Sequence, residues 1–216
     1  MSKPRSVLLD LDGTLVDSRP GIVASFDATL RELGHVPDPG FDLTFVIGPV
    51  LGDVMGVVLD HYGDTRVEAA IAAYRRHYGE TGILDVTPYE GVAELLAGLG
   101  SAGASLYLAT SKRTVFAARI LDHLGFTPHF AGIYGSEPDG FRDHKPELIA
   151  DILARHDLAP DGAVMVGDRR YDVAGAHANG LRAVGALWGY GGRQELVAAG
   201  ADLLADSPAA LLGLLA

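Results

Sequence analysis

Short, mostly apolar runs recur along this chain, and most of them are followed by a stretch whose apolar residues repeat at helical spacing. The runs lie at residues 6–11, 106–109, 130–134, 163–166 and 181–185. Strands that are apolar at consecutive positions are typical of a parallel sheet that is covered on both faces. The alternation from residue 88 onward therefore predicts an α/β fold with a doubly wound parallel sheet and a ligand site at the carboxyl ends of its strands.

One stretch is too long for this alternation. The segment from Gly13 to Ala109 is about three times as long as a whole βαβ unit, which takes roughly 30 residues. Its apolar residues form three helical stripes, at residues 22–33, 50–58 and 67–78. We therefore expect a helical cap at residues 16–83, inserted into a core that is made of residues 1–15 and 84–216.

Charge and composition exclude several classes of protein. The net charge is −11, from 17 basic against 28 acidic residues, which argues against a nucleic-acid partner. There is no cysteine, so disulfides, thiolate metal sites and a cysteine nucleophile are excluded. No apolar run approaches the roughly 20 residues that cross a membrane. We expect a globular cytoplasmic protein without membrane contact, whose oligomeric state the sequence leaves open.

Four aspartates fall at the ends of predicted strands. Asp10 and Asp12 close the first run, Asp168 follows the run at 163–166, and Asp172 lies one helical turn further on. The predicted topology can bring the four carboxylates together, and like charges that close stay ionised only beside cations. Because Mg²⁺ prefers oxygen ligands, it is the cofactor that we expect there.

Other polar residues reach the same edge of the predicted sheet. Thr110 and Ser111 follow the run at 106–109, and Lys145 lies in the segment before a predicted helix. A metal ion, an ammonium group and free backbone amides together suit a phosphoryl group, whose transfer depends mainly on positioning and charge neutralisation. These residues therefore indicate phosphoryl chemistry at the acidic edge.

The order of these groups resembles the haloacid dehalogenase superfamily of phosphohydrolases over nearly the whole chain. The first motif reads DLDGTLVDS from Asp10, the second is Thr110, the third is Lys145, and the fourth reads GDRRYD from Gly167. Further segments are similar to the phosphoglycolate phosphatase and 5′-nucleotidase-like branch, namely PYEGV from Pro88, ATSK from Ala109, GSEPDG from Gly135 and WGYG from Trp188. The resemblance implies a Rossmann-like core with a helical cap between the first two motifs.

The resemblance also implies a two-step transfer through an aspartyl phosphate. Asp10 is the expected nucleophile. Asp12 is expected to protonate the departing alkoxide and then to activate water. Thr110 is expected to hold phosphoryl oxygens, while Lys145 neutralises the nucleophile and the phosphate. The implied Mg²⁺ ligands are Asp10, the backbone carbonyl of Asp12, Asp168 and, mainly through water, Asp172.

Substrate contacts are expected from the loops beside the motifs and from one cap loop. The cap segment at residues 46–50 is similar to a family segment that faces the site, but many relatives have a second proline where Val50 stands. That difference leaves the substrate open. The expected substrate-binding residues are Leu11, Gly13, Thr110, Ser111, Lys112, Ile47, Gly48, Pro49 and Arg142.

An aspartate at position 12 favours a phosphate ester, because a halide leaves without a proton. We therefore expect a Mg²⁺-dependent phosphomonoesterase, phosphoglycolate phosphatase-like, that acts on a small phosphorylated metabolite. A 5′-nucleotidase, a sugar-phosphate mutase and an inactive phosphometabolite-binding module remain as alternatives. The four carboxylates against Mg²⁺ and Lys145 leave an expected net charge of −1 before substrate binds.

Overall fold

The chain divides into two compact units in the computed structural model, which describes residues 5–216. The larger unit contains the chain up to Asp17 and from Pro88 to Ala216, and the smaller unit runs from Ser18 to Thr87. The smaller unit is therefore an insertion in the sequence of the larger one. The division at 16–83 stays a prediction about folding domains.

A six-stranded parallel sheet forms the centre of the larger unit. Its order is β5-β4-β1-β6-β7-β8, which is the 3-2-1-4-5-6 order of a doubly wound sheet. The direction of winding changes between β1 and β6, so the ligand crevice is expected beyond those two strands. The strands are β1 (Ser6–Leu9), β4 (Ser105–Arg113), β5 (Phe130–Ser136), β6 (Ala163–Gly167), β7 (Arg182–Ala186) and β8 (Leu203–Ala205).

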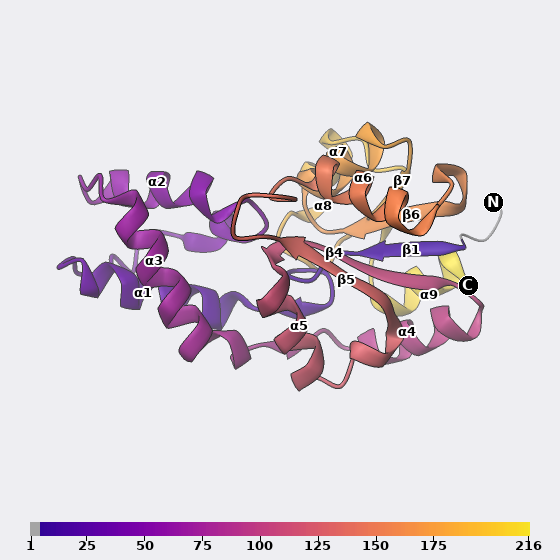
Figure 1. The fold of residues 1–216 in the computed structure, drawn as a ribbon, viewed down its shortest axis with the longest axis horizontal. Helices are drawn as coiled ribbons and strands as arrows, with labels where there is room; N and C mark the ends of the chain where they lie inside the picture. Colours follow the sequence, from indigo (N-terminus) through magenta and orange to yellow (C-terminus); the bar gives the residue numbers. More distant parts are fainter. Residues whose placement is uncertain (1–4) are drawn as a thin grey trace. The chain divides into compact units, whose positions relative to one another are not determined.

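Helices cover both faces of this sheet, which confirms the predicted fold class (Figure 1). One face carries α4 (Val92–Ser101), α5 (Thr114–His123) and α9 (Pro208–Leu215). The other carries α6 (Lys145–His156), α7 (Arg170–Ala178) and α8 (Gly192–Ala198). A cluster of buried apolar residues fills the core between the sheet and α6 and α7, and includes Leu8, Met165, Ile149, Ile152 and Val173.

The five predicted strands of the larger unit are present, but some short elements were not predicted. The strand β8, which has three residues, and the helix α8, which begins at Gly192, were not predicted. A separate two-stranded sheet joins β2 (Val16–Asp17) to β3 (Thr87–Pro88). Short 3₁₀ turns occupy residues 127–129 and 160–162. Elements of two or three residues carry no hydrophobic period, so pattern analysis misses them.

The smaller unit contains the three predicted helices, α1 (Arg19–Glu32), α2 (Leu51–His61) and α3 (Val67–Glu80). Two 3₁₀ turns, η1 (Leu43–Val46) and η2 (Gly82–Leu84), complete it. The ring of Phe26 in α1 lies 4.6 Å from that of Tyr74 in α3, and Tyr74 stacks on Tyr78 at 5.7 Å. The two tyrosines are buried, so they pack the unit's own core, as the helical spacing predicts.

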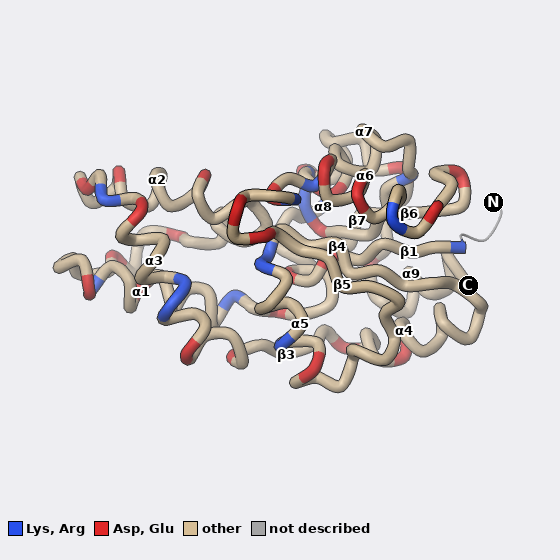
Figure 2. Tube along the Cα trace, viewed as in Figure 1, with Lys and Arg blue, Asp and Glu red and all other residues tan. Residues whose placement is uncertain are grey.

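Charged side chains are spread over both units. Figure 2 shows Asp and Glu interspersed with Lys and Arg along the described chain. Within residues 5–216, no helix has both the length and the apolarity needed to cross a bilayer. The expected absence of nucleic-acid and membrane partners stays a prediction.

The α1 helix and the η2 turn approach each other so closely that only glycine fits between them. A Cβ atom at Gly21 would lie 2.0 Å from the carbonyl oxygen of Gly82. A Cβ atom at Gly82 would lie 2.5 Å from the carbonyl oxygen of Gly21. Since both obstructing atoms belong to the backbone, the contact cannot relax by a change of rotamer.

We expect Gly21→Ala to destabilise the protein by about 1–3 kcal/mol, because the added methyl group overpacks this contact. Gly56→Ala is the matched control in α2, since a Cβ atom there meets nothing within 4 Å. It should raise stability by up to about 1 kcal/mol through helix propensity. Urea unfolding of both variants measures the two changes, and equal stabilities would contradict the close approach.

Candidate active site

Three aspartates meet beyond the carboxyl ends of β1 and β6. Asp10 follows β1, Asp168 follows β6, and Asp172 lies in the first turn of α7. Each offers one carboxylate oxygen, and these oxygens all lie within 4.8 Å of one another. All three residues are at most 3% exposed. The structure thus brings together three of the four aspartates that the sequence singles out.

Lys145, the first residue of α6, places its ammonium group among these acids. Its Nζ donates to Oδ1 of Asp10 at 2.7 Å and to the carbonyl oxygen of Ala109 at 2.8 Å, and it lies 2.5 Å from Oδ1 of Asp172. A Cβ atom at Gly175 would lie 2.6 Å from the Cβ of Lys145, so a glycine in α7 permits this approach of α6. Lys145 is therefore buried, and its ammonium group contacts three acceptor atoms.

Two loops hold the carboxylate of Asp168. The backbone N–H of Tyr190 donates to Oδ2 at 2.7 Å, and the hydroxyl of Thr14 donates to Oδ1 at 3.4 Å. Gly13 has a φ of +84°, and a Cβ atom there would lie 2.2 Å from Asp168 Oδ2. A Cβ atom at Gly189 would lie 2.3 Å from the Cβ of Asp168. The two glycines therefore let the loops close around this acid.

Neither Thr14 nor Tyr190 was predicted to hold Asp168. Tyr190 follows β7, and the position of β7 beside β6 in the sheet order is the signal that could have revealed its proximity to the acids. Gly13 was expected to contact the substrate, and that role stays a prediction. Its backbone N–H donates to the carbonyl oxygen of Val16 at 2.9 Å. Because Gly13 has no side chain, its loop can lie directly against the carboxylate of Asp168.

Asp12 lies outside the group of three acids and has its own cation. Nζ of Lys112 lies 2.9 Å from Oδ1 of Asp12, and the two side chains are 8% and 10% exposed. The expected net charge of −1 did not include this second ammonium group. Four carboxylates and two ammonium groups carry −2, so one divalent cation makes the site neutral.

The pKa values of Asp10 and Asp168 are raised, as is typical of carboxylates that gather around a cation site. Burial raises the pKa of Asp10 to about 7, and the charges of Asp172 and Asp12 add to this effect while Lys145 opposes it. Burial, followed by the charges of Asp10 and Asp172, also raises the pKa of Asp168 well above its ordinary value. Such a cluster of oxygen donors with excess negative charge fits a hard divalent cation.

The pKa of Lys145 changes in the opposite sense to what burial alone would cause. Burial disfavours the ammonium form, but the charges of Asp10 and Asp172 outweigh it and raise the pKa above its ordinary value. Lys145 therefore stays protonated across the physiological range and acts as a fixed positive charge.

Arg142 is placed in a different network from the one we expected. Its guanidinium pairs with Glu137, lies 3.3 Å from Asp151, and sits 5.4 Å from the ring centroid of Tyr134. Its backbone adopts a φ of +64°, which is rare for a residue with a side chain. These contacts hold the loop between β5 and α6, just before Lys145. The expected role of Arg142 in substrate binding stays a prediction.

The other expected substrate contacts are divided between the two units. Leu11 is buried just beyond the end of β1, Thr110 is buried within β4, and Ser111 is half-buried beside Thr110. Ile47, Gly48 and Pro49 belong to the smaller unit, after η1. The part of these residues in substrate binding stays a prediction.

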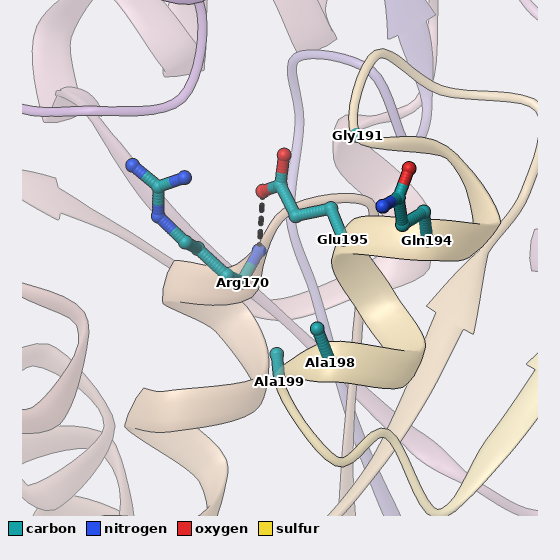
Figure 3. Close-up of a pocket in the computed structure, with 6 residues that line it drawn as sticks. All are labelled: Arg170, Gly191, Gln194, Glu195, Ala198 and Ala199. Carbon is teal, nitrogen blue, oxygen red and sulfur yellow. Dashed lines mark hydrogen bonds between the residues drawn. The ribbon is translucent and has the colours of Figure 1, made fainter.

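A surface pocket of about 490 Å³ lies elsewhere on the larger unit, between the start of α7 and α8 (Figure 3). It includes none of the four aspartates. The backbone N–H of Arg170 donates to Oε1 of Glu195 at 2.9 Å, and Nε of Arg169 donates to the same oxygen at 3.0 Å. Through these two hydrogen bonds, Glu195 holds the start of α7, the helix that contains Asp172, in position. We place the candidate site at the acids, where charge and burial converge.

Comparison with known proteins gives consistent results. A family model described as haloacid dehalogenase-like hydrolase matches residues 7–186. A 5′-nucleotidase from Pseudomonas aeruginosa is 41% identical over 194 residues, which cover 88% of this chain and 86% of that protein. The tyrosine-protein kinase PtkA from Mycobacterium tuberculosis is 42% identical over 189 residues, which cover 87% of this chain but 64% of that protein.

A phosphoglycolate phosphatase from Neisseria gonorrhoeae is 34% identical over 194 residues, which cover 87% of this chain and 81% of that protein. Among solved structures, a protein from Clostridium acetobutylicum that is named as a predicted phosphatase superposes with a TM-score of 0.91. It is 34% identical, and the match covers 98% of both chains. The likeness therefore extends over both units of the fold.

We expect divalent cations to stabilise the protein more at high pH than at low pH. With its pKa raised to about 7, folded Asp10 holds a proton that the unfolded chain releases between about pH 4 and 7, so its contribution to stability falls as pH rises through that window. The raised pKa of Asp168 acts in the same direction. A cation binds the ionised carboxylates and competes with those protons. The rise in melting temperature on adding MgCl₂ should be larger at roughly pH 8 than at roughly pH 5.5.

Asp168→Asn is the control for this measurement, because it removes the charge but keeps an oxygen for the Tyr190 N–H. The variant should lose most of the rise in melting temperature at both pH values. An undiminished rise in this variant would place the cation elsewhere.

Proposed function

The chain belongs to the haloacid dehalogenase-like hydrolase family, and from that membership we propose that it is a hydrolase of phosphoric monoesters that acts through an aspartyl phosphate. The observation that carries the proposal is the buried contact between Asp10 and Lys145, with Asp168 and Asp172 beside it. A carboxylate that is held by an ammonium group among further acids is suited to attack phosphorus while charge accumulates around it.

In this proposal Asp10 attacks the phosphorus atom and the ester oxygen leaves. The attack needs the ionised carboxylate, and Lys145 favours that form because its Nζ lies 2.7 Å from Oδ1. The same ammonium group offsets the negative charge that the phosphoryl group brings. Since Lys145 is buried and its pKa is raised, it holds this charge without exchanging protons.

Asp12 supplies the proton in this proposal. It protonates the leaving oxygen in the first step and takes a proton from the attacking water in the second. Its placement supports this division, because its side chain is absent from the group of three acids and pairs with Lys112 instead. Nucleophile and acid are thus two carboxylates with two different cationic partners.

Mg²⁺ is the proposed cofactor. Its ligands would be Asp10, the backbone carbonyl of Asp12, Asp168 and Asp172. When bound, it supplies positive charge to the phosphoryl oxygens and to the acids. The buried oxygen donors and the −2 charge of the site support this choice.

The substrate is proposed to be a small phosphorylated metabolite in the cytoplasm. Relatives with the names phosphoglycolate phosphatase and 5′-nucleotidase support two candidate classes, a short phosphorylated acid and a nucleoside monophosphate. A sugar-phosphate mutase shares the motifs and is the third candidate. The buried Asp10, Asp12 and Lys145 argue against an inactive binding module.

We expect the purified protein to hydrolyse p-nitrophenyl phosphate in the presence of MgCl₂. A chelator should abolish the release of p-nitrophenol, since the acids then lack their cation. Asp10→Asn should lower kcat by at least about a thousandfold, because the amide cannot form the covalent intermediate. Steady-state rates check both effects, and thermal melting checks that the variant folds.

Asp12→Asn tests the proposed acid separately. It should slow alkyl phosphates more than p-nitrophenyl phosphate, because p-nitrophenolate leaves readily without a proton. Turnover that survives Asp10→Asn would contradict the proposed nucleophile, and turnover that survives the chelator would contradict the metal.

A further inference from the structure

The WGYG segment that begins at Trp188 follows β7, and the proposed chemistry does not yet use it. The indole Nε1 of Trp188 donates to the carbonyl oxygen of Thr14 at 2.9 Å, and the backbone N–H of Tyr190 donates to Oδ2 of Asp168 at 2.7 Å. A Cβ atom at Gly191 would lie 2.1 Å from the carbonyl oxygen of Asp168. The segment therefore lies directly against the first and the fourth motif.

The side chain of Tyr190 has a second attachment, at the far end of its ring. Its hydroxyl donates to Oδ1 of Asp17 at 2.8 Å, and a side-chain hydrogen bond also joins it to Tyr89. Asp17 is the last residue of β2 and Tyr89 follows β3, so the hydroxyl is attached beside both strands of the two-stranded sheet. These contacts lie within the larger unit, at the two places where the insertion interrupts its chain.

Tyr190 therefore connects a proposed cation ligand to a paired strand. A carboxylate turns about its side-chain bonds unless its oxygens are held, and the Tyr190 N–H holds Asp168 at 2.7 Å, against 3.4 Å for the hydroxyl of Thr14. The position of that N–H depends on its loop, and the bond to Asp17 limits how far the loop moves. Removing a group that orients a metal ligand commonly lowers metal affinity by about 10–100-fold.

We propose that Tyr190 is a positioning residue for the cation site, because its hydroxyl bond to Asp17 fixes the backbone N–H that orients the carboxylate of Asp168. The inference rests on the proposed Mg²⁺ site and is independent of the substrate. In this role Tyr190 contacts neither the cation nor the substrate, and it acts through Asp168. The cation affinity of the acids is then set in part by a hydroxyl outside the four motifs.

Isothermal titration calorimetry with MgCl₂ tests this role without any substrate. Y190F removes only the hydroxyl and keeps the ring and the backbone N–H, and its Kd for Mg²⁺ should be about tenfold higher than that of the wild type. D17A removes the acceptor and should have the same effect. Because both substitutions break one bond, the double variant should lose no more affinity than either single variant.

Y134F is the matched control. Tyr134 also lies in the larger unit, and its hydroxyl lies 2.6 Å from Nε2 of His156. Its backbone belongs to the pairing of β5 with β4, so Y134F should cost stability but leave the Kd for Mg²⁺ as in the wild type. Thermal melting without MgCl₂ checks that each variant folds. If Y190F does not fold, D17A carries the same comparison.

Hydrolysis of p-nitrophenyl phosphate gives a second readout. The MgCl₂ concentration that gives half of the maximal rate should rise in Y190F by the same factor as the Kd. At saturating MgCl₂, kcat should stay within about twofold of the wild type, because the cation then restores the orientation of the acid. A residue that only packs the loop would change neither quantity.

Several results would overturn the assignment. One is a Kd for Mg²⁺ that is unchanged in Y190F while the melting temperature falls, which would make the hydroxyl purely structural. Another is an additive loss in the double variant, which would mean that the effect does not run through Asp17. A wild-type protein that binds no Mg²⁺ would overturn the inference together with the proposed cofactor, whereas Mg²⁺ binding without hydrolysis of any ester would contradict the proposed function alone.

Discussion

The buried ammonium group of Lys145 is the interaction on which the arrangement of the site depends. It touches Asp10 from the end of β1 and Asp172 from the start of α7, and so it joins three separate parts of the chain. Without that charge the buried carboxylates would repel one another, and breaking a buried pair commonly costs about 3–5 kcal/mol. The same contact that lets the acids coexist also prepares Asp10 to meet a phosphoryl group.

Close approach of backbones makes that contact possible. Gly175 brings α6 and α7 together at Lys145, and Gly13 and Gly189 bring two loops against Asp168. Each of these positions leaves no room for a Cβ atom. The acids are therefore held by rigid elements rather than by long side chains, and positioning of that kind supports the precise geometry that phosphoryl transfer needs.

The sequence predicted the long elements and the acids well and the cationic partners poorly. Five strands with apolar runs and the three inserted helices were found from their periods, whereas β8 was too short to show one. The pairing of Arg142 with Glu137 and Asp151 was not predicted, because an arginine in a loop gives no sign of its partners. Lys112 was expected at the substrate, but its pairing with Asp12 joins residues 100 positions apart in sequence.

The sequence by itself determined the doubly wound sheet, the inserted helices and which strand ends carry Asp10, Asp12, Asp168 and Asp172. These follow from local periods and from the rule that ligands bind where the winding of the sheet reverses. Only the tertiary structure decided which cation faces which acid. Pairing of that kind depends on distances of about 3 Å between groups that the chain separates widely, and no local pattern encodes them.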